Sequence, residues 1–225
     1  MRRAPRQFEL RYRTWGGSRK GAGRPRTSRN TPHRRRPTIG RSHPIHLTLR
    51  LSRLLPSLRT RLCLALLWRA FRRTRGLRIV HFSVQKDHLH LLVEVVDGGA
   101  RGLTNGVRSL CTLVARQLNR WLRRKGNVFS DRYHAHVLRT PREVRNALVY
   151  VIHNYKRHRA PTPEGLGFDP FSSAPYFPGW AEGPVSWPKP PTGPPPVAAP
   201  QSYLLAQSWK ALAPIRLSEA PSPRG

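Results

Sequence analysis

Acidic residues are scarce in this sequence of 225 residues. Ten Asp and Glu side chains stand against 42 Lys and Arg side chains, which gives a formal net charge of +32. This surplus argues against a neutral soluble enzyme and favours a polyanionic partner, with nucleic acid ahead of an anionic membrane. Arginine supplies all but six of the cations and can hold phosphate through two parallel hydrogen bonds. Since a GC-rich genome would give the same arginine preference, the inference rests on the charge itself.

Cysteine and long apolar runs are also scarce. The sequence has two cysteines, Cys63 and Cys111, and their spacing matches neither a disulfide framework nor a zinc site. No run approaches the ~20 apolar residues that span a bilayer, and no apolar stretch follows Met1. We therefore expect reduced, buried thiols and a cytoplasmic protein that does not bind a membrane.

Proline is absent between Pro56 and Pro141, and this gap marks the expected folded domain, residues 43–159. Before it, residues 1–42 carry 14 basic and 1 acidic residue with little apolar content, which predicts a disordered basic arm. After it, residues 160–225 hold 16 of the 23 prolines and no net charge. We expect that tail to be largely disordered.

Alternating and helical periodicities divide the domain into seven elements. Period-2 patterns predict strands over residues 45–51, 77–85, 89–95 and 133–139. Helical spacing predicts helices over 57–73 and 103–124, and a third from Thr140 to about His158. Thr140 and Glu143 form a capping-box pattern at the start of this third helix. The order β-α-β-β-α-β-α predicts an α+β protein with a ferredoxin-like antiparallel sheet and an added C-terminal helix.

Two histidines on the third predicted strand are candidate metal ligands. His88 and His90 are two residues apart, so they project from the same face of the strand. Two imidazoles on one rigid strand can share a divalent metal. An isolated histidine pair of this kind is nevertheless weak evidence, and other residues must support it.

The last predicted helix offers a nucleophile and a further ligand. Tyr150 and Asn154 are four residues apart and would lie on one helix face. A tyrosine phenolate can attack a phosphodiester, and the asparagine carbonyl can ligate a metal. His153 is a second candidate for ligand or base. Without such context, an aromatic on an amphipathic helix is more often part of the core.

Together these residues resemble the single-tyrosine HUH transposases, especially those associated with repetitive extragenic palindromes and the IS200-like group. The resemblance covers about residues 43–158 and rests on His88-Leu-His90 followed by Tyr150-Val-Ile-His-Asn154. It implies a metal-dependent endonuclease and strand transferase that cuts single-stranded or hairpin DNA. It also implies Mg²⁺ or Mn²⁺ held by the two histidines and Asn154, and a 5′-phosphotyrosine intermediate at Tyr150.

The sequence departs from the family pattern directly after Asn154. Relatives usually have proline there, whereas this chain has Tyr155, a second candidate nucleophile that is rotated by about 100° from Tyr150. The departure keeps open an alternative, a catalytically inactive domesticated relative that binds structured single-stranded DNA or RNA. Whether two subunits form a homodimer is also open. A general RNA-binding module is less favoured, because histidines and Glu94 occupy the sheet face where such modules carry aromatics.

Basic side chains near the second and third predicted helices are candidates for contacts with nucleic-acid phosphates. Such contacts would supply affinity that falls steeply with salt. The candidates are Arg116, Arg120, Arg123, Arg124, Lys125, Arg139, Arg142 and Arg145.

Overall fold

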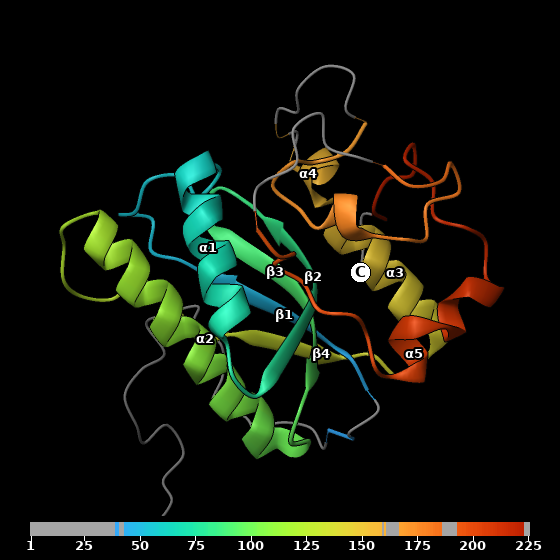
Figure 1. The fold of residues 1–225 in the computed structure, drawn as a ribbon, viewed down its shortest axis with the longest axis horizontal. Coiled ribbons are helices and arrows are strands. Elements are labelled where there is room, and N and C mark those ends of the chain that lie inside the picture. Colours follow the sequence, from blue (N-terminus) through green and yellow to red (C-terminus); the bar gives the residue numbers. More distant parts are fainter. Residues whose placement is uncertain (1–38, 41–42, 159, 161–166, 186–192, 223–225) are drawn as a thin grey trace, which may run out of the picture. The chain divides into compact units, whose positions relative to one another are not determined.

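A four-stranded antiparallel sheet forms the centre of the domain (Figure 1). The computed structural model describes residues 39–40, 43–158, 160, 167–185 and 193–222, so the predicted basic arm lies almost entirely outside the described residues. The strands are β1 (Ile45–Arg50), β2 (Leu77–Val84), β3 (His88–Val95) and β4 (His134–Val137), in the spatial order β2-β3-β1-β4. This order is that of a ferredoxin-like split βαβ sheet and confirms the predicted α+β fold class.

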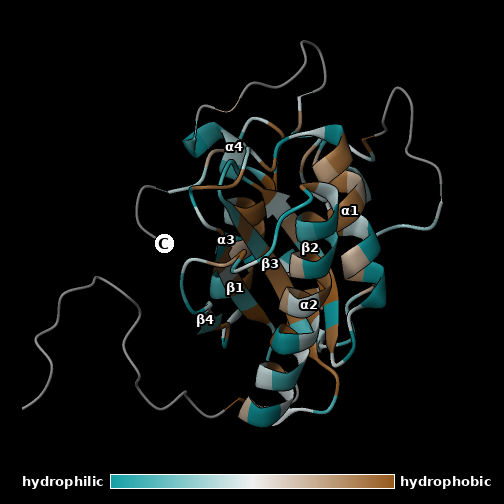
Figure 2. Cartoon of the chain, turned by 90° about the vertical axis from the view of Figure 1, so that its left-hand side faces the viewer, coloured by the Kyte–Doolittle hydropathy of each residue, from teal (hydrophilic) through white to brown (hydrophobic). Residues whose placement is uncertain are grey.

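The two faces of the sheet have different covers, which fixes where a site can open. Helices α1 (Arg61–Arg73) and α2 (Gly99–Trp121) pack together over one face, on the apolar side chains that alternate along β1 and β3. Figure 2 faces these helices and shows apolar and hydrophilic residues alternating along them, as amphipathic helices require. The other face is covered by α3 (Pro141–Ile152), which packs on Leu92 and Val80 in a second core.

Local chemistry shifts the starts of the first two predicted helices. We predicted that the first helix starts at Ser57, but α1 starts at Arg61 because Thr60 caps it, accepting a hydrogen bond from the Cys63 amide. The second helix starts four residues earlier than predicted, directly after the β3 turn. There Gly98 and Gly99 have φ angles of 69° and 70°, a conformation that favours glycine.

The third predicted helix is interrupted, contrary to the expectation of one helix to about His158. Its start is as predicted, with the Thr140 and Glu143 capping box in place. It ends at Ile152, and a separate turn, α4 (Asn154–Arg157), follows His153. The His153 ring lies 3.0 Å from the Arg216 carbonyl oxygen, and the Lys156 ammonium donates to the Leu217 and Glu219 carbonyls. These contacts with the C-terminal segment hold the chain at the break.

The proline-rich region is packed over residues 167–185 and 193–222, and the expectation of a largely disordered tail is wrong for these residues. Their buried side chains include Phe168, Phe177, Trp180, Leu205 and Trp209, which join α3 in the second core. The region also contains the short helices η1 (Ala174–Tyr176), α5 (Tyr203–Ala206) and η2 (Ser208–Ala211). Proline content misled the prediction because proline prevents long helices and central strands but does not prevent irregular segments from burying aromatics.

Specific polar contacts attach this region to the sheet. The Phe171 carbonyl accepts a hydrogen bond from the Val84 amide. The chain around Phe171 therefore pairs with β2, which is an edge strand of the sheet. Asp169 is fully buried and holds the Arg59 guanidinium through two hydrogen bonds of 2.9 and 2.8 Å. Further along, the Glu94 carboxylate accepts from the backbone amides of Gln201 and Ser202.

Among the helices of the described residues, none has the length and apolar character needed to cross a membrane.

Candidate active site

The predicted histidine pair lies on the sheet face that α3 covers. His88 pairs with Arg50 of β1 and His90 pairs with Thr48, while Leu89 and Leu91 point into the core beneath α1 and α2. The rings of His88 and His90 have centroids 4.9 Å apart. The strand therefore places both imidazoles side by side, as the two-residue spacing predicted.

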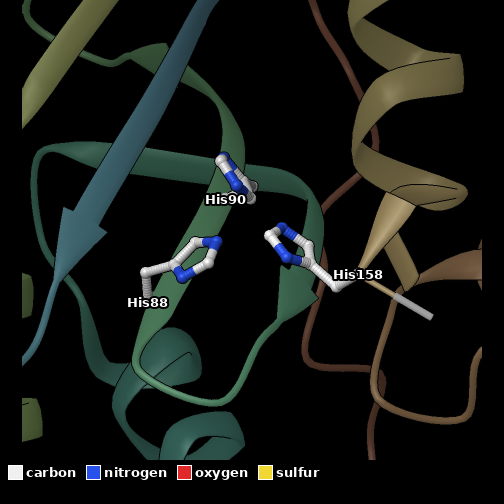
Figure 3. Close-up of side chains that lie close together, drawn as sticks. All are labelled: His88, His90 and His158. Carbon is white, nitrogen blue, oxygen red and sulfur yellow. The ribbon is translucent and has the colours of Figure 1, made fainter. Parts of the chain in front are cut away.

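A third histidine completes a cluster that the sequence analysis missed. His158, at the end of α4, points toward His88 and His90 (Figure 3). One ligand atom from each of the three rings lies within 4.8 Å of the others. In the sequence, His158 is four residues after Asn154 and eight residues after Tyr150. A search for histidines at helical spacing from the tyrosine would have found it.

The environment keeps the ring of His90 neutral. Burial, followed by the nearby rings of His46 and His88, lowers the pKa of His90 to about 2. Its Nδ1 lies 3.2 Å from both Thr48 Oγ1 and His46 Nε2, while its Nε2 is buried without a hydrogen-bond partner among the described residues. A neutral imidazole with one unused buried nitrogen is suited to ligate a cation.

The other two histidines have an accessible side. His88 Nδ1 lies 2.7 Å from the Asp87 carboxylate, and a carboxylate at that nitrogen favours the tautomer with a free lone pair on Nε2. Burial opposes ionisation of Asp87, but the hydrogen bond and charge of His88, the charge of Arg50 and a local backbone hydrogen bond together outweigh it and lower the pKa of this carboxyl. His158 is exposed, and burial together with the nearby His88 lowers its pKa.

Tyr150 lies against this cluster. Its ring centroid is 5.1 Å from that of His90 and 5.4 Å from that of His46, in edge-on geometry in both cases. The guanidinium carbon of Arg157 lies 5.7 Å from the Tyr150 ring centroid. The side chain is partly exposed, so a substrate can reach it. The tyrosine and the histidines that sequence spacing selected are therefore brought together by the fold.

The remaining candidates of the last helix have separate surroundings. Asn154 is fully buried, and neither its amide nitrogen nor its amide oxygen has a hydrogen-bond partner among the described residues. His153 is fully buried against the C-terminal segment, beside Trp180. Tyr155 is 8% exposed and donates its hydroxyl hydrogen to the Gly167 carbonyl. Burial, with the charge of Asp169, raises the pKa of Tyr155, which makes it a poor nucleophile.

Two cavities flank the histidine cluster. One, of about 620 Å³, has a lining that includes Tyr150, His46, Thr48, His134 and His136, together with Glu219, Ala220 and Ser222 of the C-terminal segment. We call it the tyrosine cavity. The other, of about 730 Å³, includes His88 and His158 in its wall together with Arg50, Arg53 and Lys86. We call it the cationic cavity.

The predicted phosphate-contacting residues occupy different parts of the domain. Arg116 and Arg120 are exposed on α2, and Arg123, Arg124 and Lys125 follow it, so this group belongs to the helix that covers the face opposite the histidines. Arg139 and Arg142 are exposed at the start of α3. Arg145 differs from them, because its guanidinium forms two hydrogen bonds of 2.9 Å with Glu219. Arg145 is therefore engaged by the protein itself, whereas phosphate binding by the others stays a prediction.

Comparisons with known proteins find a distant likeness to solved structures. No family model matches the chain, and no curated protein matches it. Among solved structures, a REP-associated tyrosine transposase bound to a REP hairpin is 19% identical, with a TM-score of 0.49 over 64% of this chain and 82% of that one. A presumed transposase from Deinococcus radiodurans R1 is 16% identical, with a TM-score of 0.36 over 53% and 92%. Both are described as transposases.

Proposed function

We propose that this protein is a metal-dependent endonuclease and strand transferase that cuts single-stranded DNA with Tyr150. The observation that carries the proposal is the edge-on contact of the Tyr150 ring with His90, one member of the three-histidine cluster. A phenol beside a site that can hold a cation has the parts that phosphodiester cleavage by a tyrosine requires. The formal net charge of +32 supports a nucleic acid as the substrate.

The donor set fits a divalent transition metal. His90 offers a buried, neutral nitrogen without a partner, and the carboxylate of Asp87 orients His88. We assign His158 as the third ligand, and Asn154 remains the further candidate one turn before it. Because imidazole nitrogens suit transition metals better than they suit Mg²⁺, the cluster favours Mn²⁺ of the two expected ions. A bound cation would polarise the scissile phosphate and stabilise its developing charge.

The chain's own residues account for the rest of the reaction. Tyr150 gives up its phenolic proton to solvent, and its oxygen forms a bond with phosphorus while the bond from phosphorus to the 3′ oxygen breaks. The 3′ oxygen takes a proton and leaves as a hydroxyl, so the 5′ phosphate stays on Tyr150. The Arg157 guanidinium, beside the Tyr150 ring, adds a permanent positive charge next to the phosphate. Attack by a 3′ hydroxyl on the phosphotyrosine reverses the steps and joins strands.

A covalent-adduct assay tests this proposal. Hairpin oligonucleotides from the DNA that flanks the gene are incubated with the protein and Mn²⁺ and separated on a denaturing gel. We expect a protein–DNA adduct that disappears with a chelator and in Tyr150→Phe, and that persists in the matched control Tyr155→Phe. An adduct that survives in Tyr150→Phe would identify another nucleophile. Tight binding without any adduct in the wild-type protein would instead support the inactive DNA- or RNA-binding alternative.

A further inference from the structure

The two cavities lie on opposite sides of the histidine cluster. His158 and His88 line the cationic cavity, and His46 and Tyr150 line the tyrosine cavity. The ring of His90 lies between them, since it contacts His88 at 4.9 Å and Tyr150 at 5.1 Å between centroids. Strand β1 runs from one cavity to the other. His46, Thr48 and Arg50 lie on the same face of this strand, and the first two line the tyrosine cavity, whereas Arg50 lines the cationic cavity.

The cationic cavity presents two positive charges that the protein leaves available. Arg53 and Lys86 are exposed, and neither forms an ion pair within the described part of the chain. Arg50 is a third cation of this wall. It lies near the Asp87 carboxylate, and its positive charge helps to lower the pKa of that group. By contrast, the guanidinium of Arg59 in the same wall is held by Asp169. A hollow of about 730 Å³ with free cations suits a phosphate-bearing ligand, since ligand sites span about 300–1,000 Å³.

In-line displacement relates the two cavities to the two products of cleavage. In phosphoryl transfer the attacking and leaving oxygens lie roughly in line on opposite sides of phosphorus. If Tyr150 attacks from its own cavity, the leaving 3′ oxygen lies on the side of His88 and His158. This is the side on which the cationic cavity opens.

We propose that the cationic cavity binds the 3′-terminal nucleotides of the strand that leaves, through phosphate contacts with Arg53 and Lys86. The inference rests on the proposed function, because it takes Tyr150 as the nucleophile. As the bond between Tyr150 Oη and phosphorus forms, the bond to O3′ breaks, and O3′ takes a proton and remains in the cavity. Retention of this end keeps the hydroxyl close to the phosphotyrosine and favours rejoining over simple nicking.

Rejoining by a supplied strand tests the assignment. Wild-type adduct is prepared, the leaving strand is washed away, and a short oligonucleotide with a 3′ hydroxyl is added over a range of concentrations. We expect Arg53→Ala/Lys86→Ala to need more substrate DNA to form adduct. Once its adduct has formed, we expect the variant to need about tenfold more oligonucleotide than the wild-type protein for half-maximal rejoining, with a shallower salt dependence. The matched control is Arg72→Ala/Arg108→Ala, which removes two exposed arginines that line a separate cavity between α1 and α2. Equal effects in the two variants would mean that bulk charge alone acts, and would overturn the proposal.

A second measurement does not require cleavage. An oligonucleotide with a photoreactive 3′-terminal thymidine is crosslinked to Tyr150→Phe, and the attached peptides are identified by mass spectrometry. We expect attachment near Arg53 or Lys86, and attachment near His134 or His136 in the tyrosine cavity would overturn the assignment. Absence of any wild-type adduct overturns the proposed function, whereas crosslinking at the wrong cavity overturns only the strand placement.

Discussion

Replacement of Asp87 by alanine is predicted to weaken metal binding without touching a ligand. The Asp87 carboxylate lies 2.7 Å from His88 Nδ1, where it fixes the ring's orientation and leaves Nε2 free. Loss of such a partner typically lowers metal affinity about 10- to 100-fold, or about 1.4–2.7 kcal/mol. Because the Asp87 side chain is 34% exposed, solvent already screens its charge, and we expect about a tenfold loss, near the lower end.

The assay is a Mn²⁺ titration without DNA, with the free ion followed by electron paramagnetic resonance. Asp97→Ala is the matched control, because Asp97 is an exposed carboxylate that follows β3, whereas Asp87 precedes it. Both variants lose one negative charge, so a general electrostatic effect would weaken them equally. If Asp87→Ala bound Mn²⁺ as tightly as the wild-type protein, Asp87 would not orient His88 for metal binding. This result would refute the reasoning. Circular dichroism confirms that each variant is folded.

Three further predictions concern the third ligand, the packed tail and the response to pH. We expect His158→Ala to reduce Mn²⁺ affinity about 100-fold and Asn154→Ala less than about tenfold; the reverse ranking in the same titration would make Asn154 the third ligand. Asp169→Ala breaks a buried ion pair with Arg59 and should cost about 3 kcal/mol, or about 6–12 °C in Tm; an unchanged melting curve would show that residues 167–177 do not pack as described. Burial lowers the pKa of His81 from 6.5 to about 4, so unfolding takes up a proton in this range. The contribution of His81 to stability is therefore full above about pH 6.5 and falls by about 3 kcal/mol at pH 4. Urea denaturation should find the fall in stability over this pH range smaller in His81→Gln than in the wild-type protein.

Most of the domain could be predicted because its signals are local. Strand periodicity places apolar residues such as Leu89 and Leu91 on one face of β3, and the same alternation places His88 and His90 on the other. The Thr140 and Glu143 capping box fixed the start of α3. Helix and strand order then limits the topology, and the ferredoxin-like arrangement follows from it.

The end of α3 could not be predicted in this way. Nothing in the local pattern around His153 signals a break, because the contacts that accompany it come from Arg216, Leu217 and Glu219 far along the chain. The fully buried Asn154 was therefore placed on one continuous helix face with Tyr150. The packed tail was missed for the same reason, since Asp169 meets Arg59 across 110 residues.

What the sequence by itself determined is the chemistry available: a cationic chain, an imidazole pair that must share a face, and a tyrosine about sixty residues later. Only the tertiary structure decided which groups meet, because the separation between α4 and β3 depends on packing among segments distant in sequence. It brought His158 to the imidazole pair, engaged Arg145 with Glu219, and opened a cavity on each side of the cluster. Side-chain periodicity follows from backbone geometry within one element, whereas the meeting of elements follows from the burial of apolar surface across the whole domain.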